Sequence, residues 1–161
     1  MTETRALSAD SLRSRESRVL AAWALEHGGD EFTIEVMALQ GTPAPLADAF
    51  EDRLAPWVAA SARRVTLWAP LKGEFTREVR LWRLTPLSAA LLDEYLPDGL
   101  FSYDVQERGW FENPIVYRNG AFLYGALTHE REGYLRVSND EAGELSALGI
   151  PLGATMTGLA F

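Results

Sequence analysis

The chain contains no cysteine among its 161 residues. This absence excludes disulfide bonds, thiolate nucleophiles and zinc sites built on sulfur. Histidine is also scarce, because His27 and His129 are the only two imidazoles. Any imidazole chemistry therefore depends on these two side chains.

Basic residues are fewer than acidic ones. The sequence has 15 lysine and arginine residues against 23 aspartate and glutamate residues, which gives a formal net charge of −8. Lys72 is the sole lysine. Because a negatively charged surface repels phosphate backbones, we expect no nucleic-acid partner.

Long apolar runs are absent as well. Residues 1–17 mix charges of both signs and lack the apolar core of a signal peptide, and no later run approaches the length that crosses a bilayer. We therefore expect a cytoplasmic protein with no membrane partner. What remains is an ordinary globular composition, 47% hydrophobic and 24% charged, which predicts a single domain over residues 1–161.

Hydrophobic periodicity predicts an α+β domain. In chain order, the patterns indicate a helix over Ser8–His27, a strand over Phe32–Val36, a helix over 46–61 interrupted at Pro56, strands over Arg64–Ala69 and Phe75–Leu84, a helix over Thr85–Leu96 and a strand over Leu100–Gln106. From the first strand onward this order is β-α-β-β-α-β. It is typical of a ferredoxin-like sheet with its helices on one face.

The last third of the chain predicts an antiparallel meander that extends this core. Asn119-Gly120 is a strong signal for a two-residue hairpin turn, and a second hairpin is expected at residues 130–133. Ser138 and Glu141 form a capping box that predicts a helix through Leu148. Residues 156–161 are expected to form a final strand. The ferredoxin-like core thus gains an N-terminal and a near-C-terminal helix.

Residues 28–32 spell GGDEF, which resembles the signature of the diguanylate cyclases. In that family the motif follows an earlier strand that ends in a metal-binding aspartate. Only 27 residues precede Gly28, and their pattern predicts one helix. Because two Mg²⁺ ions need carboxylates from more than one segment, we do not transfer the family's activity. We interpret the glycines as a helix stop, Asp30 and Glu31 as an exposed connection, and Phe32 as the first buried residue of a strand.

Alternation in the hairpin over Arg64–Leu84 predicts an aromatic sheet face. If Val65, Leu67, Val79 and Leu81 point toward the helices, tryptophans interleaved with arginines point away from them. The candidate binding residues on this face are Arg64, Trp68, Arg80 and Trp82. Such side chains stack on flat ligands or on a partner's side chains.

The Asn119-Gly120 turn predicts a second group of aromatic side chains. It pairs Tyr117 with Phe122, and Ile115 with Tyr124, on one face of the hairpin. We therefore predict a non-enzymatic protein that binds a small molecule or a protein partner, or forms a homodimer, through Tyr117, Phe122, Tyr124 and the tryptophan face. The sequence leaves open whether that face is a dimer interface, a ligand site or a surface covered by the chain's own helices.

The alternative function is a small-molecule enzyme built on His129. This imidazole, with Asp104 or the neighbouring Glu130 and Glu132, suits metal or acid–base chemistry. Adjacent strand residues point to opposite faces, however, and the segment enters a turn. A solvated hairpin tip is therefore favoured, and no catalytic residue, metal or cofactor is predicted.

Overall fold

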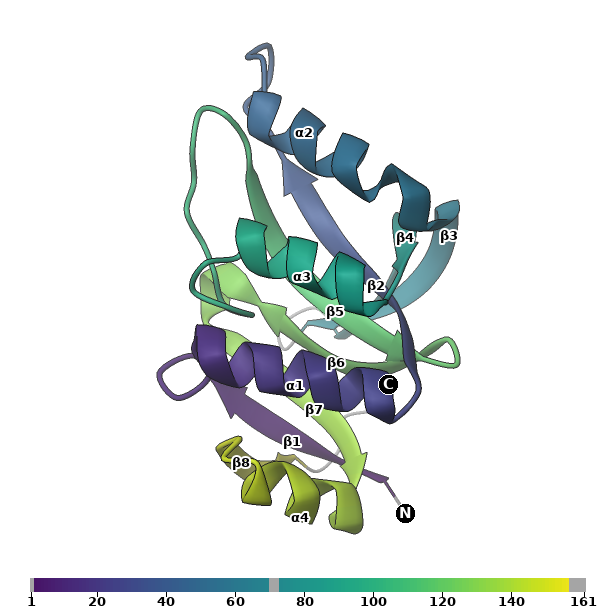
Figure 1. The fold of residues 1–161 in the computed structure, drawn as a ribbon, viewed down its shortest axis with the longest axis vertical. Helices are drawn as coiled ribbons and strands as arrows, with labels where there is room; N and C mark the ends of the chain where they lie inside the picture. The colour runs from purple at the N-terminus through teal and green to yellow at the C-terminus, as the bar shows by residue number, and fades with distance from the viewer. Residues whose placement is uncertain (1, 70–72, 157–161) are drawn as a thin grey trace.

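The computed structural model describes the backbone of residues 2–69 and 73–156, and the side chains of these ranges except those at 61–69 and 73–78. Within these ranges the chain is a mixed α+β domain with an eight-stranded sheet and four α-helices (Figure 1). The strands are β1 (Thr2–Ser8), β2 (Gly29–Met37), β3 (Val58–Ala69), β4 (Gly73–Arg83), β5 (Trp110–Arg118), β6 (Ala121–Leu127), β7 (Glu132–Ser138) and β8 (Leu152–Met156). The helices are α1 (Ser14–Glu26), α2 (Pro45–Leu54), α3 (Pro86–Tyr95) and α4 (Asn139–Ala147), with short 3-10 turns η1 (Ala55–Trp57) and η2 (Thr128–Glu130).

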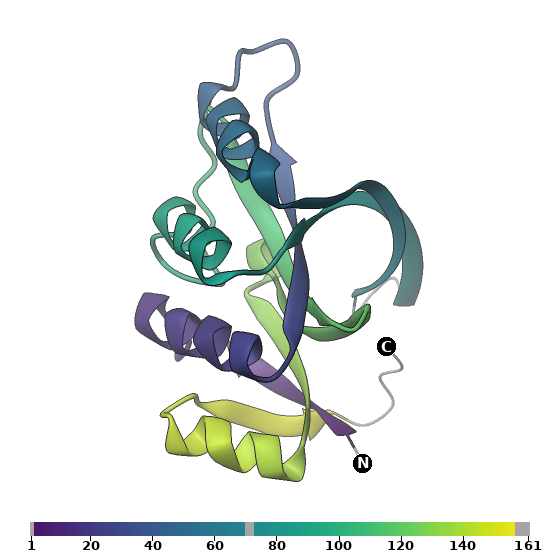
Figure 2. The same ribbon diagram turned by 45° about the vertical axis from the view of Figure 1, so that its right-hand side comes forward.

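The sheet runs in the order β3-β4-β2-β5-β6-β7-β1-β8, and each neighbouring pair is antiparallel. Helices α1, α2 and α3 lie on one face, which we call the helix face, while the β3–β4 hairpin curls away on the other side (Figure 2). None of the helices in the described ranges has the length and apolar composition needed to cross a membrane.

Several local predictions are confirmed by the dihedral angles and the caps. Asn119 and Gly120 have φ values of 51° and 74°, as the tight turn between β5 and β6 requires. Ser138 accepts a hydrogen bond from the backbone N–H of Glu141 and caps α4. The interruption at Pro56 is also confirmed, because α2 gives way there to η1.

The predicted start of the first helix at Ser8 is wrong, because residues 2–8 form β1. This strand pairs with β7 along its whole length, from Thr2 opposite Ser138 to Ser8 opposite Glu132. Its polar residues give no clear period-two pattern, and Leu7 is its one large apolar side chain buried in the core. Pairing with a strand some 130 residues away therefore determines its structure, and a local pattern cannot report that.

The predicted strand over Leu100–Gln106 is also wrong, because the segment between α3 and β5 is a loop. Leu100 and Phe101 are buried, and the backbone N–H of Leu100 donates to Ser17 Oγ of α1 at 2.8 Å. The apolar residues thus anchor a loop on α1. The fourth strand of the predicted core is therefore absent at this place, and β5, the next strand along the chain, pairs with β2 instead. The ferredoxin-like assignment itself stays a prediction.

The final strand lies earlier than predicted. It is β8, Leu152–Met156, and it pairs with β1 at the sheet edge. The predicted strand over residues 156–161 lies beyond the described residues, apart from Met156.

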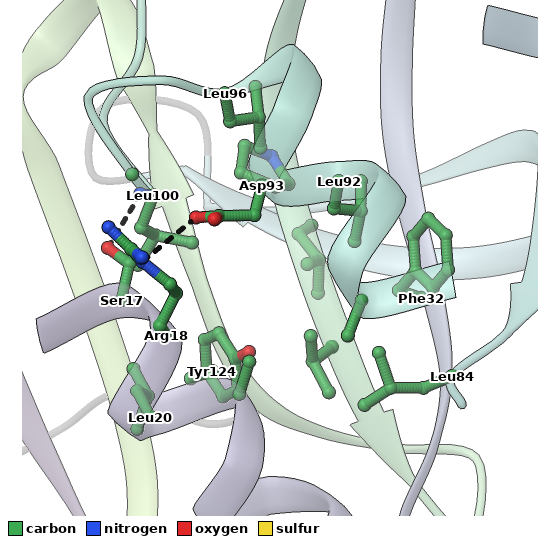
Figure 3. Close-up of a pocket in the computed structure, with 16 residues that line it drawn as sticks. Ser17, Arg18, Leu20, Phe32, Leu84, Leu92, Asp93, Leu96, Leu100 and Tyr124 are labelled. Carbon is green, nitrogen blue, oxygen red and sulfur yellow. Dashed lines mark hydrogen bonds and ion pairs between the residues drawn. The ribbon is translucent and has the colours of Figure 1, made fainter. Parts of the chain in front are cut away.

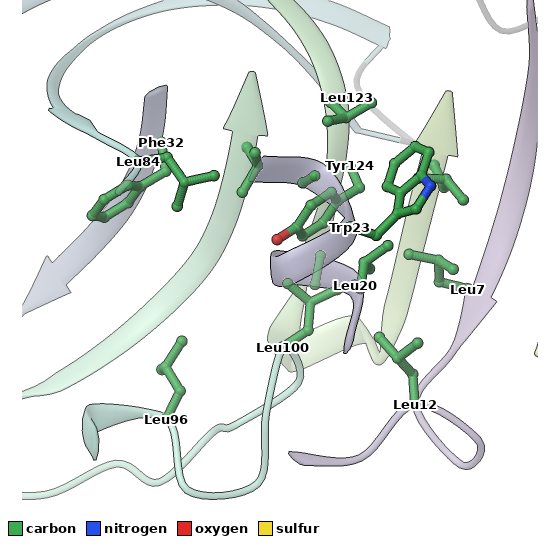
Figure 4. Packing of buried hydrophobic residues seen from close by; sticks show 14 of the residues in the cluster. Leu7, Leu12, Leu20, Trp23, Phe32, Leu84, Leu96, Leu100, Leu123 and Tyr124 are labelled. Carbon is green, nitrogen blue, oxygen red and sulfur yellow. The ribbon is translucent and has the colours of Figure 1, made fainter. Parts of the chain in front are cut away.

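The hydrophobic core lies between the helix face and its helices (Figure 4). Leu20 and Trp23 of α1 pack over β6 and β7, where Leu123 and Leu135 are fully buried. Farther along the sheet, α2 inserts Phe50 among the aromatic rings of neighbouring elements. The candidate site described next lies between these two parts of the core.

Candidate functional site

Trp82 does not lie on an open sheet face, which corrects the sequence prediction. It is 1% exposed and stacks on Phe32 at a centroid distance of 5.6 Å. Trp82 pairs directly with Phe32 across β4 and β2, so both rings belong to the helix face. The predicted alternation is therefore shifted by one residue. Trp82 points to the helix face, and Leu81, which is also buried, points to the other face.

Arg80 follows Trp82 to the helix side. Its guanidinium lies 3.2 Å from the Glu51 carboxylate of α2, and both side chains are substantially exposed. Arg80 is thus a partner of α2. The side chains of the other two candidates on this hairpin, Arg64 and Trp68, lie outside the described residues.

The β5–β6 hairpin separates its aromatic residues. Tyr117 pairs with Phe122 as predicted, but Tyr124 pairs with Val116 instead of Ile115. Leu123 falls between these two pairs, and this bulge moves Tyr124 onto the helix face. The predicted Ile115–Tyr124 pair is therefore wrong.

Tyr117 and Tyr124 occupy different environments. Tyr117 lies on the face away from the helices, where its hydroxyl is 3.4 Å from Thr33 Oγ1, and burial raises its pKa. Tyr124 lies under α1. The predicted aromatic cluster is thus divided between the two faces, and Tyr124 alone reaches the cavity described next.

A cavity of about 70 Å³ lies between α1, α3 and the sheet (Figure 3); we call it the α1–α3 cavity. Its walls are mainly apolar, with alanines on both helices and larger side chains around them: Ala21, Leu84, Ala89, Leu92 and Leu96. The two alanines leave space that longer side chains would fill. The cavity is several times larger than the 10–15 Å³ or so that one water needs.

The Tyr124 hydroxyl is the polar group of the cavity's sheet side. Tyr124 is 4% exposed, lines the cavity, and has no hydrogen-bond partner in the part of the chain that the structure describes. Burial raises its pKa, so the side chain is a neutral phenol at physiological pH and offers an O–H donor. A water or a ligand atom in the cavity would satisfy it.

The rim of the cavity is polar. The Nε of Arg18 on α1 lies 3.4 Å from the Asp93 carboxylate of α3 and donates to the Ser14 carbonyl at 3.3 Å. Beside it, the Ser17 hydroxyl accepts the hydrogen bond from Leu100. Figure 3 shows this rim crossing from α1 to α3.

The alternative site at His129 lacks the predicted partner Asp104. His129 lies at the β6–β7 connection with Nδ1 3.5 Å from Glu112 and Nε2 3.5 Å from Glu130. Asp104 instead accepts a hydrogen bond from Gln106. In the described residues no group of three or more His, Cys, Asp or Glu side chains is arranged to hold a metal ion.

The two glycines of the GGDEF segment have structural roles. Gly28 has φ +82° and ends α1, while a Cβ on Gly29 would lie 2.8 Å from the Ala24 carbonyl oxygen. Phe32 is buried as predicted. Asp30 and Glu31, however, belong to β2 itself, which corrects their placement in a connection.

Sequence reasoning missed the helix residues of the site. Arg18 and Ala21 were part of a predicted helix without any role, and so was Ala89. The available signal was a small residue on the apolar side of each helix. That signal also fits tight helix packing, so it does not by itself predict a cavity.

The chain matches no family model, no curated protein and no solved structure. The functional argument therefore proceeds from the geometry of the α1–α3 cavity.

Proposed function

We propose that this protein binds a small, mostly apolar molecule in the α1–α3 cavity. The observation that carries the proposal is the hydroxyl of Tyr124, which belongs to a buried side chain, has no hydrogen-bond partner among the described residues and lies beside a cavity with alkyl walls. Ligand sites typically combine an apolar lining with a few polar groups that fix orientation. Tyr124 is such a group.

The chemistry of the cavity selects the part of the ligand that enters it. Because Tyr124 is a neutral donor, its partner is an acceptor such as a carbonyl or ether oxygen. Apart from Arg18 and Asp93 at the rim, the lining has no charged side chain to compensate an ion, so an ionised group is excluded from the interior. The volume of about 70 Å³ limits the buried part to a short alkyl chain or a small ring.

Methyl-observed NMR with 2-hexanone, a neutral ketone, tests the proposal. We expect saturable shifts of the Ala21, Ala89 and Leu92 methyl signals. We expect none at Leu145, a buried residue of α4 that does not line the cavity. Ala89→Leu should fill the cavity and remove the saturable shift at Leu92.

Ala90→Leu is the matched control, because Ala90 is the exposed neighbour of Ala89 on α3. It should leave binding unchanged. Absence of a saturable shift in the wild type, or equal binding by both leucine variants and the wild type, would refute the proposal.

Homodimer formation and binding of a protein partner stay predictions. Tyr103 and Val105, both about half exposed at 47% and 51%, lie on the loop between α3 and β5 and are available to such contacts. Light scattering over a concentration series measures the oligomeric state directly.

A further inference from the structure

The rim of the α1–α3 cavity carries hydrogen-bond donors that the protein does not use. The Nε of Arg18 contacts Asp93 and the Ser14 carbonyl, and the two terminal guanidinium nitrogens make no hydrogen bond within the described residues. The Ser17 hydroxyl accepts from Leu100, and its own hydrogen likewise has no acceptor in that part of the chain. Two adjacent residues of α1 thus present free donors at the mouth of an apolar cavity.

These donors suit an anion in general and a carboxylate in particular. The two terminal nitrogens of arginine match the two oxygens of a carboxylate in a bidentate pair. Asp93 limits the positive charge here, but the Arg18 Nε–Asp93 distance is a long 3.4 Å and the Arg18 side chain is 62% exposed. A second carboxylate can therefore reach the guanidinium from solvent.

Resting on the proposed function, we infer that the ligand is a small oxo monocarboxylate. Its carboxylate lies at the rim on Arg18 and Ser17. Its alkyl chain enters between α1 and α3, and its neutral carbonyl oxygen accepts a hydrogen bond from Tyr124. One part of the ligand then matches each part of the site. The carboxylate matches the donors at the rim, the alkyl chain matches the alkyl walls, and the carbonyl oxygen matches the Tyr124 phenol.

Three probes separate these parts of the recognition. They are 5-oxohexanoate, 2-hexanone, which lacks the carboxylate, and hexanoate, which lacks the ketone. Dissociation constants are measured by methyl-observed titration at constant ionic strength. We expect 5-oxohexanoate to bind about tenfold more tightly than 2-hexanone, in the range of a charge-assisted hydrogen bond, and more tightly than hexanoate.

Variants assign the effect to residues. Arg18→Gln should reduce the affinity for 5-oxohexanoate to that for 2-hexanone and leave 2-hexanone unaffected. Arg15→Gln is the matched control, because it makes the same charge change on α1 at a side chain that is 79% exposed and paired with Glu16. Asp93→Asn removes the competing carboxylate and should strengthen binding of both acids.

The outcomes distinguish the two proposals. If 2-hexanone binds but 5-oxohexanoate binds no tighter, or if Arg15→Gln weakens 5-oxohexanoate as much as Arg18→Gln does, the oxo-acid inference is wrong and the proposed function stands. If none of the three probes shifts the cavity methyl signals, both are wrong.

Discussion

The helix face of the sheet is closed in two different ways. Beneath α2, Phe50 lies 4.6 Å from Phe111 and 5.0 Å from Tyr95, centroid to centroid, and Trp82 completes this aromatic group. Between α1 and α3, small alanine side chains leave a cavity of about 70 Å³. The same sheet surface thus becomes solid core or open site according to the size of the residues that the helices contribute.

In each region a buried side chain carries a donor that has no hydrogen-bond partner among the described residues. Trp82 Nε1 has no hydrogen-bond partner within the described residues, and neither has the Tyr124 hydroxyl. Trp82 is enclosed by aromatic rings, whereas Tyr124 adjoins the cavity. An unpaired donor in a closed core only destabilises the fold, but one beside a cavity is available to a ligand.

Phe50→Ala gives the largest expected effect. Removing a fully buried ring from the aromatic group should lower the free energy of unfolding by about 3–5 kcal/mol. Leu92→Ala in the cavity wall is the comparison, with an expected loss of about 2 kcal/mol, because Leu92 is only partly buried and already borders empty space. Urea unfolding measures both. Equal losses would show that the two regions are packed alike.

Gly29→Ala tests how firmly α1 is fixed at its C-terminal end. The new Cβ would lie 2.8 Å from the backbone oxygen of Ala24, so we expect a loss of about 1–3 kcal/mol in unfolding free energy. Gly143→Ala is the control, because nothing lies within 4 Å of its Cβ position and alanine favours the helix. It should stabilise by up to about 1 kcal/mol. A harmless Gly29→Ala would contradict the structural role of the GGDEF segment.

An alanine-to-leucine substitution in each region compares how well the two regions accept added atoms. Ala47→Leu places a larger side chain in the closed region, where Ala47 is buried beside Gly109, and should destabilise by about 1–3 kcal/mol. Ala89→Leu extends into the α1–α3 cavity and should change the unfolding free energy by less than about 1 kcal/mol. Thermal and urea unfolding of the two variants decide this. A larger loss for Ala89→Leu would mean that the cavity cannot accept added atoms.

The smallest effect is a pH dependence outside both regions. Burial acts to raise the pKa of Glu141, but hydrogen bonds from Arg118 at 2.6 Å and from the Ser138 N–H at 2.7 Å outweigh it and hold the pKa below 4.5. Because the folded pKa is lower than the unfolded one, this stabilisation is fully present above pH 4.5 and disappears as the pH falls through the folded pKa. We expect about 1 kcal/mol or less. Glu141→Gln should flatten this part of the acid-unfolding profile, and an unchanged profile would contradict the assignment.

Local signals predicted the elements whose determinants are local. The start of the helix at Thr85, the Asn119-Gly120 turn and the Ser138 capping box each depend on signals within a few residues, and all three are confirmed. Strand β1 depends on β7, from the other end of the chain, and was missed. Leu100 lies in a loop but resembles a strand residue in sequence. A buried apolar residue gives the same sequence pattern whether it belongs to a strand or to a loop.

The candidate site was less predictable than the fold. Tyr124 was identified, but for a different face, since the bulge at Leu123 reverses its direction and no turn residue signals it. The prediction for Trp82 is wrong because Leu81 and Trp82 are adjacent in β4 and both are large and apolar. The alternation therefore does not show which of the two faces the helices. The α1–α3 cavity depends on how two helices meet, which neither helix encodes alone.

The most direct test of the account is the dissociation constant of 2-hexanone for the wild type and for Tyr124→Phe, measured by methyl-observed titration. A net hydrogen bond contributes about 1 kcal/mol, so the account predicts roughly fivefold weaker binding to the variant. Equal dissociation constants for the two proteins, or no binding to the wild type, would contradict the assignment of the α1–α3 cavity as a site anchored by Tyr124.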